Sequence, residues 1–242
     1  MPLESSAVTE HPEAITFRNV RVLAGQGQLL EIPHLDLTEQ RISVIGPNGG
    51  GKSTLLQLVN GLVEPTEGRV STEGLDTVEQ GRQLRQCTGF VFSNPAAQLV
   101  MPTPLEDVEL SLRRSVRDSA QRRRAALQTL AELGIADLAE RSSQELSSGQ
   151  QQLVALATVL TLRPRTLLLD EPTTLLDLAN AARFTQLVRS MERKHRIRTI
   201  TATHDLELAA AAERTLLVAG GKVVAEGEPQ EVIAAYRRCS TG

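Results

Sequence analysis

The sequence predicts an α/β protein built on a mainly parallel sheet, and three observations support this fold class. Short apolar strand patterns alternate with helical patterns, an order typical of a parallel sheet covered by helices on both faces. A glycine-rich loop lies between the first clear strand and the helix after it. The stretch from Pro104 to Leu162 is helical in pattern and poor in strands, which indicates a helical subdomain inserted between two halves of the sheet.

The individual elements are predicted from short apolar runs and from the residues that end them. Arg41–Ile45 is an apolar strand, and Gly61 is well placed to end the helix expected at 53–60. Further along we expect strands at 88–92, 166–169 and 199–202, helices near 178–194 and from Asp205, a hairpin of 214–219 with 222–225, and a closing helix at 229–238. An antiparallel β region therefore accompanies the parallel core.

These elements divide the chain into a short tail and one domain. We expect residues 1–14 to form an N-terminal tail and residues 15–242 to form the domain. Within the domain, residues 15–92 and 164–242 make the core, and residues 93–163 make the helical subdomain.

Composition argues against several classes of protein. The chain has 242 residues, 40% of them hydrophobic, and a net charge of −3, which is not the basic balance of a nucleic-acid-binding domain. The arginines between residues 113 and 124 are expected to be a solvated helix face. Cys87 and Cys239 make no disulfide framework. Met1–Glu10 does not look like a signal peptide, and no apolar run approaches the roughly 18 residues of a membrane span.

A phosphate-binding loop follows the strand Arg41–Ile45. The segment from Gly46 to Ser53 matches the pattern G-x-x-x-x-G-K-[ST] between a strand and a helix, which is the context that the pattern requires. Backbone N–H groups of the glycines converge on phosphate oxygens, Lys52 reaches the β- and γ-phosphates of ATP, and the Ser53 hydroxyl ligates Mg²⁺. The candidate nucleotide-binding residues are Gly46, Pro47, Asn48, Gly49, Gly50, Gly51, Lys52, Ser53 and Thr54. We therefore expect a P-loop NTPase core of the RecA-like type.

Two adjacent carboxylates end the apolar strand that begins at Thr166. Buried strands seldom end in neighbouring acids unless a cation or a proton transfer needs them. Asp170 is placed to hold Mg²⁺ through its water shell, and Glu171 is placed to polarise the attacking water. With a phosphate loop upstream, these residues predict a nucleotide-hydrolysing site with Mg²⁺ as cofactor.

Further short motifs resemble those of the ATP-binding-cassette (ABC) ATPases. Residues 146–150, Leu-Ser-Ser-Gly-Gln, resemble the LSGGQ signature, and Asp170-Glu-Pro-Thr resembles the family's DEPT. Asp177 falls where the D-loop aspartate of the family lies, and His204 resembles its switch histidine. Each motif alone is weak, but their order and spacing together are specific and extend from about Ile15 to Glu231.

The resemblance implies a mechanism that needs two cassettes. ATP would lie between the phosphate loop of one cassette and the signature of the other, and the partner cassette would be a second copy or a related chain. The signature residues are Ser147, Ser148, Gly149 and Gln150, of which Ser147 and Gly149 would contact the γ-phosphate across the interface. Lys52, Glu171 and His204 would be the catalytic residues, with His204 holding Glu171 and its water in place.

Several residues depart from the family's pattern. Ser93 stands where the family has a glutamine that ligates Mg²⁺, so Ser93 would act on the metal only through a water. Ser148 replaces a signature glycine, and Leu175 replaces a small residue of the D-loop. The stretch 20–27 lacks the aromatic residue that stacks on adenine. Because Lys52 and Glu171 are present, hydrolysis is still expected.

A second set of residues resembles one branch of the family. Residues 94–99 and 104–108 resemble the segment that energy-coupling-factor ATPases carry, which serve uptake of vitamins, cobalt or nickel. Residues 37–42 look like the biotin-system subunit. The resemblance implies an integral-membrane coupling protein and a substrate-capture membrane protein as partners, with this chain at the cytoplasmic face of the membrane. Leu99, Val100 and Met101 are candidate contacts to the coupling protein, although they are equally compatible with the core of the helical subdomain.

Two alternatives remain at this stage. A soluble ABC ATPase of translation or DNA repair is disfavoured, because such proteins usually carry two cassettes or long coiled coils. A nucleotide-regulated module without turnover is kept open by Ser93 and Ser148, but Glu171 and His204 argue against it.

Overall fold

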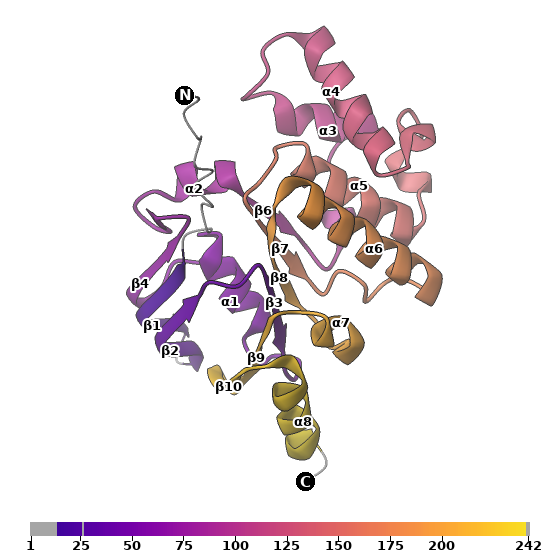
Figure 1. The fold of residues 1–242 in the computed structure, drawn as a ribbon. Coiled ribbons are helices and arrows are strands. Elements are labelled where there is room, and N and C mark those ends of the chain that lie inside the picture. Colours follow the sequence, from indigo (N-terminus) through magenta and orange to yellow (C-terminus); the bar gives the residue numbers. More distant parts are fainter. Residues whose placement is uncertain (1–13, 26, 241–242) are drawn as a thin grey trace, which may run out of the picture.

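The computed structural model describes residues 14–25 and 27–240 (Figure 1). Most of the expected tail, residues 1–13, lies outside the described residues. The strands are β1 (Ile15–Ala24), β2 (Gly27–Leu37), β3 (Arg41–Ile45), β4 (Glu67–Thr72), β5 (Leu75–Asp76), β6 (Thr88–Val91), β7 (Thr166–Asp170), β8 (Arg198–Ala202), β9 (Arg214–Ala219) and β10 (Lys222–Gly227). The α-helices are α1 (Lys52–Val59), α2 (Gly81–Cys87), α3 (Pro104–Leu112), α4 (Ser119–Glu132), α5 (Ser148–Leu160), α6 (Leu178–His195), α7 (Leu206–Ala210) and α8 (Pro229–Ser240).

The described strands join into one sheet in the order β5-β4-β1-β2-β10-β9-β3-β8-β7-β6. Strands β9, β3, β8, β7 and β6 run parallel to one another and form the core that the sequence predicts. Antiparallel pairing of β1 with β2 and β4, and of β10 with β9, makes the antiparallel region. In a parallel sheet the carboxyl ends of the strands meet at one edge, so the loops after β3, β7 and β8 lie together.

Helices cover both faces of the sheet, as expected for an α/β fold. On one face α1 packs into an apolar cluster with β1, β2 and the core strands, which includes Phe17, Val44 and Leu216. On the other face α5 and α6 pack on β6 and β7 through a second cluster, and α7 and α8 pack on β3 and β9 through a third. Figure 1 shows α3 and α4 standing away from the sheet, with α5 and α6 between them and the strands.

The helical stretch between β6 and β7 is packed around α5. Helix α3 begins with a capping box, in which Thr103 and Glu106 satisfy each other's backbone N–H groups, and Pro104 takes the first turn. Its inner face, with Leu105 and Val108, is buried against α5. Helix α3 ends at Leu112 and helix α4 begins at Ser119, so of the arginines expected on a helix face only those at 122–124 lie within a helix. In the described part of the chain no helix is both long enough and apolar enough to cross a membrane.

Candidate nucleotide site

The phosphate loop connects the end of β3 to the start of α1. Gly46 has a φ of 145°, and a Cβ atom there would lie 2.0 Å from the carbonyl oxygen of Val218. Gly51, the N-cap of α1, has a φ of 112°. Residues with side chains seldom adopt these angles, so the glycines are required by the close approach to β9 as well as by the turn. The loop and Glu171 line a pocket of about 380 Å³.

Lys52 points back along its own loop. Its side chain is only 6% exposed, and Nζ donates to the carbonyl oxygens of Gly46 at 2.9 Å and Pro47 at 3.3 Å. Nζ also lies 3.5 Å from Oε1 of Glu171. The ammonium group is therefore held over the pocket by the loop carbonyls and by a carboxylate from the next motif.

Ser53, which lines the pocket, contacts Asp170 at the end of β7. The Ser53 hydroxyl donates to Oδ1 of Asp170 at 2.9 Å. Asp170 is buried at the end of β7, and burial raises its pKa above the usual range, with the charge of Glu171 adding to the rise. No group of three or more histidine, cysteine or acidic side chains that could hold a metal occurs among the described residues. A hydroxyl and a carboxylate nevertheless fit Mg²⁺, which takes one or two protein ligands together with phosphate and water oxygens.

Glu171 is held by contacts from three directions. Its Oε2 lies 2.7 Å from Nδ1 of His204 and accepts from the backbone N–H of His204 at 3.3 Å. The Thr174 hydroxyl donates to the same oxygen at 3.3 Å. Glu171 has a φ of 48°, a strained angle for a residue with a side chain, which persists only where the surrounding contacts maintain it.

His204 reaches this point because β7 and β8 are parallel neighbours. Asp170 pairs with Ala202 in the sheet, and the N–H of Glu171 donates to the carbonyl of Ala202 at 2.9 Å. The segments after both strands therefore leave the same edge. Lys52, Ser53, Asp170, Glu171 and His204 thus come together from three parts of the chain, at the position where sequence predicts a nucleotide site.

The signature segment lies apart from this pocket. Ser147 is the N-cap of α5, and its hydroxyl and the Gln150 side chain form a capping box. Gly149 is buried against Asn180, where a Cβ atom would lie 3.1 Å from the Asn180 Cγ. Asp177 is the N-cap of α6 and accepts from the N–H of Asn180 at 2.8 Å. None of the described residues 147–150 lines the phosphate pocket, so one chain carries the two motifs on separate surfaces.

The structure also gives the position of Ser93, the residue that stands where the resemblance places a metal-ligating glutamine. Ser93 is exposed and does not line the phosphate pocket in the described structure. Gln98 accepts from the N–H of Phe92 at 3.2 Å and donates to the Ala155 carbonyl and the Thr158 hydroxyl, both at 3.3 Å. Its amide therefore binds α5 and does not take the place of a metal ligand in this conformation.

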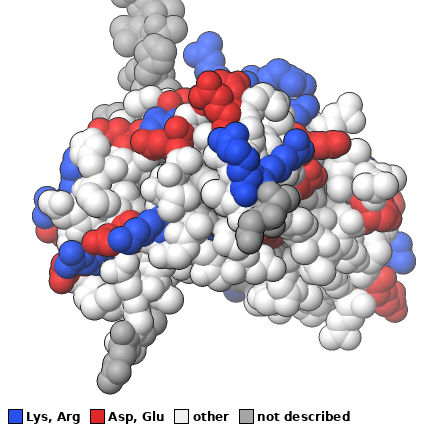
Figure 2. All heavy atoms as spheres, turned by 90° about the horizontal axis from the view of Figure 1, so that it is seen from below, with Lys and Arg blue, Asp and Glu red and all other residues white. Residues whose placement is uncertain are grey.

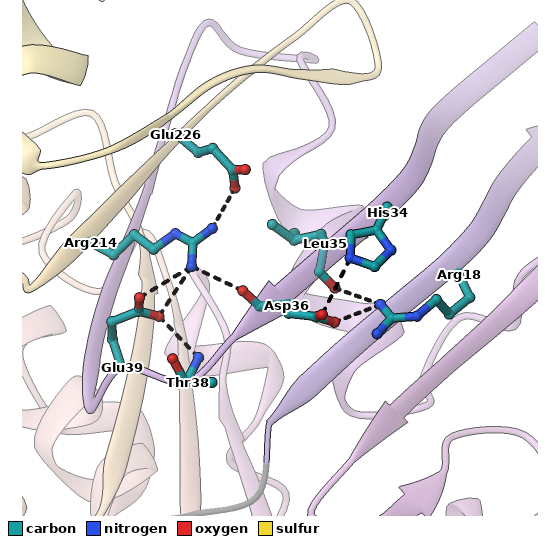
Figure 3. A network of polar contacts seen from close by, with 8 residues as sticks. All are labelled: Arg18, His34, Leu35, Asp36, Thr38, Glu39, Arg214 and Glu226. Carbon is teal, nitrogen blue, oxygen red and sulfur yellow. Dashed lines mark hydrogen bonds and ion pairs between the residues drawn. The ribbon is translucent and has the colours of Figure 1, made fainter.

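The segment 37–42, which resembles the biotin-system subunit, has a structural role through Glu39. Arg214 donates to both carboxylate oxygens of Glu39, to the Asp36 carbonyl at 2.9 Å and to Glu226 at 2.8 Å (Figure 3). This network lies at the amino ends of β3 and β9, the opposite end of the strands from the phosphate loop. It fixes the turn before β3 and does not reach the pocket.

The fold and the site together define a P-loop nucleotide-binding protein, and comparison with known proteins gives the family. The family model for ABC transporters matches residues 34–174. The chain therefore belongs to the ABC transporter family and is an ATPase of that class. It is 38% identical over 223 residues to the biotin transport ATP-binding protein BioM of Rhizobium etli, covering 92% of this chain and 97% of the relative. It is 37% identical over 210 residues to the energy-coupling factor transporter ATP-binding protein EcfA1 of Symbiobacterium thermophilum, covering 85% of this chain and 73% of the relative.

Solved structures of the same family share the fold. The structure of cbiO1 from Clostridium perfringens, described as part of the ABC transporter complex cbiONQ, matches with a TM-score of 0.81 and 29% identity over 91% of this chain and 90% of that one. The dimeric post-hydrolysis state of the cassette MJ0796, bound to ADP and phosphate, matches with a TM-score of 0.79 and 31% identity over 89% of this chain and 98% of that one. The predicted fold class and the predicted family are therefore confirmed.

Proposed function

We propose that this chain is the ATP-binding and ATP-hydrolysing subunit of an energy-coupling-factor type importer. The observation that carries the proposal is the arrangement at the carboxyl edge of the sheet. Lys52, Ser53 and Glu171 line one pocket, Asp170 contacts Ser53, and His204 contacts Glu171. The similarity to EcfA1 and BioM supports the branch of the family.

The phosphate loop would bind the triphosphate of ATP. Backbone N–H groups of residues 49–54, at the start of α1, would hold the phosphate oxygens with the help of the helix dipole. Lys52 would exchange its loop carbonyls for the β- and γ-phosphate oxygens, which are stronger partners for an ammonium group. Ser53 and Asp170 would hold Mg²⁺, directly and through water respectively. When bound, Mg²⁺ supplies charge neutralisation between the two phosphates.

Glu171 would act as the general base. Its carboxylate stands at the mouth of the pocket, next to Lys52, where it would orient a water and accept its proton. His204 would fix the direction of that carboxylate through the 2.7 Å contact and would reach the γ-phosphate from the same side. Glu171, His204 and Lys52 are therefore proposed as the catalytic residues.

A second cassette would complete the site. The signature at the start of α5 does not line the pocket of its own chain, so its helix N-terminus is free to face a phosphate bound elsewhere. The dimeric state of the similar cassette MJ0796 supports this arrangement. We propose a head-to-tail dimer with a second copy or a related chain, in which Ser147 and Gly149 approach the γ-phosphate held by the partner.

The membrane partner would dock beside α3. A groove of about 290 Å³ lies between β6, α3 and α5, and Val100 is 68% exposed at its rim while Leu99 packs inward. The exposed Val100 side chain would offer a partner an apolar contact beside this groove. We propose that an integral-membrane coupling protein, accompanied by a substrate-capture membrane protein, binds there and holds this chain at the cytoplasmic face of the membrane. That cbiO1 is part of the complex cbiONQ supports a partner of this kind.

The transported substrate is proposed from similarity alone, because the ATPase does not contact it. Similarity to BioM favours biotin, and the alternative is a cobalt or nickel ion. A role on nucleic acid is disfavoured, since acidic and basic side chains are interspersed on the face that Figure 2 shows and the net charge is −3.

The proposal is tested by identifying the proteins that co-purify with the tagged chain from gently solubilised membranes. A polytopic coupling protein together with a small membrane protein that binds biotin would support it fully. The same coupling protein with a capture protein that binds Co²⁺ or Ni²⁺ would support the importer, and the proposed substrate would then be a metal ion and not biotin. Recovery with ribosomes or DNA would overturn the importer.

A further inference from the structure

Two departures from the family's pattern touch each other in this chain. The hydroxyl of Ser148 donates to the carbonyl oxygen of Leu175 at 2.9 Å. Ser148 is the first residue of α5 and belongs to the signature segment, while Leu175 belongs to the loop between β7 and α6. A glycine at position 148 has no side chain to make this contact. The hydroxyl therefore adds a direct bond between the signature and the loop that begins with Glu171.

The loop 171–177 is short and is held at both ends. At its start the N–H of Glu171 is bonded to the sheet, and the strained φ of Glu171 sets the direction in which the loop leaves. At its end Asp177 caps α6. Between these points the N–H of Thr174 donates to the Glu171 carbonyl at 3.3 Å, and Leu176 packs against the apolar cluster of the helical subdomain. Helix α5 contacts this turn through the hydrogen bond from Ser148 to the Leu175 carbonyl.

The side chains of Leu175 and Leu178 face solvent, in contrast to that of Leu176. Leu175 is 53% exposed and Leu178 is 91% exposed, so packing of these side chains does not fix the middle of the loop in the single chain. A hydrogen bond to the backbone then has more effect than it would in a packed turn. Because the Ser148 hydroxyl donates to the Leu175 carbonyl, the Ser148 side chain connects two segments of the same chain.

The link continues to the carboxylate of Glu171. Thr174 precedes Leu175, and the Thr174 hydroxyl donates to Oε2 of Glu171 at 3.3 Å, the oxygen that also contacts His204. A shift of the Leu175 carbonyl would move Thr174 and so alter the direction of the carboxylate. Misdirecting a general base by a fraction of an ångström lowers the rate of the chemical step without removing the phosphate contacts that bind ATP.

We propose that Ser148 is a positioning residue for Glu171, acting through the Leu175 carbonyl and Thr174. This inference rests on the proposed function, because it concerns the carboxylate of the same ATPase site. In the proposed dimer the signature of one cassette would face the ATP of the other, so Ser148 would also connect the nucleotide bound by the partner to the base of its own chain.

The test compares Ser148→Ala, Ser148→Gly and Ser148→Thr in the purified transporter complex by steady-state phosphate release. One hydroxyl hydrogen bond corresponds to a change of about threefold to tenfold in an equilibrium or a rate. We expect Ser148→Ala and Ser148→Gly to lower kcat by about fivefold, with the KM for ATP changed less than about twofold. Ser148→Thr restores the hydroxyl and is expected to recover most of the lost rate.

The matched control is Ser71→Ala, which removes a hydroxyl bond of 3.0 Å to Thr16 between β1 and β4, far from both motifs. A general loss of folding would lower the active fraction of any variant and would not be recovered specifically by threonine. Unchanged kcat in Ser148→Ala, a change in KM alone, or a Thr variant as slow as the Ala variant would each overturn the inference. If Glu171→Gln hydrolyses ATP as fast as the unaltered complex, the proposed function itself fails. That result is distinct from a failure of the inference about Ser148.

Discussion

The imidazole Nδ1 of His204 lies 2.7 Å from Oε2 of Glu171, although the residues are 33 positions apart in the sequence. They meet because β7 and β8 are parallel neighbours whose carboxyl ends share one edge of the sheet. The pair places a histidine beside a carboxylate at the mouth of the phosphate pocket, and its geometry leads to the first prediction.

Replacing His204 by alanine removes the contact that directs the carboxylate. We expect His204→Ala to hydrolyse ATP about a hundredfold more slowly while still binding it, because the phosphate loop is untouched. Phosphate release and calorimetric ATP binding check the two parts. His34→Ala is the control, since His34 pairs with Asp36 at the surface of β2. Equal rates in the two variants would remove His204 from the mechanism.

Replacing Lys52 by alanine removes a buried ammonium group from the pocket. Hydrogen bonds to charged groups contribute about 1.5–3 kcal/mol, so ATP affinity should fall roughly 10- to 150-fold in Lys52→Ala. Calorimetry measures this directly. Lys194→Ala removes a surface ion pair with Glu132 and should leave affinity unchanged. Unaltered binding by Lys52→Ala would contradict the assignment of the phosphate loop.

Asp107 makes stability depend on pH. Its Oδ1 accepts from the N–H groups of Val100 and Met101, but its buried Oδ2 has no partner among the described residues. Burial raises the pKa of Asp107 above the usual value of about 3.9. At pH values between the pKa of Asp107 in the unfolded chain and its higher pKa in the folded chain, the folded chain binds more protons. The free energy of unfolding therefore falls as pH rises through that window.

Above that window the Asp107 carboxyl therefore lowers the stability of the fold relative to more acidic pH. We expect Asp107→Asn to have a higher melting temperature at pH 7 and a flatter pH dependence, because a neutral amide costs less to bury than a charge. Thermal unfolding of both proteins across the acidic and neutral range is the measurement. A lower melting temperature at pH 7 with the same pH dependence would be the opposite result.

The exposed side chain at the groove should matter for partner binding. Val100→Asp places a charge on an apolar contact, and we expect about tenfold or greater loss of the co-purifying coupling protein. Val224→Asp is the control, since Val224 is also exposed but lies on β10, on another part of the molecule. Quantitative mass spectrometry of the two purifications compares them. Equal recovery of the coupling protein would show that the groove is not its docking site.

Local patterns predicted the core well, because its strands are short, apolar and bounded by clear turns. The ranges expected for β3, β9 and the helix α8 agree closely with the structure. The long strands β1 and β2 were not assigned, since they are half exposed and β2 contains Pro33 and charged residues that weaken a strand pattern. Helix α2 was missed as well, being short and polar.

The site was predicted in parts, and the sheet order explains what could not be. Motifs identified Lys52, Asp170, Glu171 and His204 one by one, but their mutual distances depend on which strands are neighbours, and that order is non-local. The bond from Ser148 to Leu175 was also beyond sequence reasoning. Both residues depart from the family's pattern, yet only the packing of α5 beside the loop brings them into contact.

The central claim is that Glu171 is the base of an ATPase site completed by a second cassette. The most direct measurement is phosphate release by Glu171→Gln, with the oligomeric state followed in the same sample by size-exclusion chromatography with light scattering. We predict that the variant binds ATP, hydrolyses it at least about a hundredfold more slowly, and accumulates as an ATP-bound dimer of cassettes. Normal turnover by Glu171→Gln would contradict the account. So would a variant, measured in the purified transporter complex, that binds ATP without pairing with a second cassette, whether a copy or a related chain.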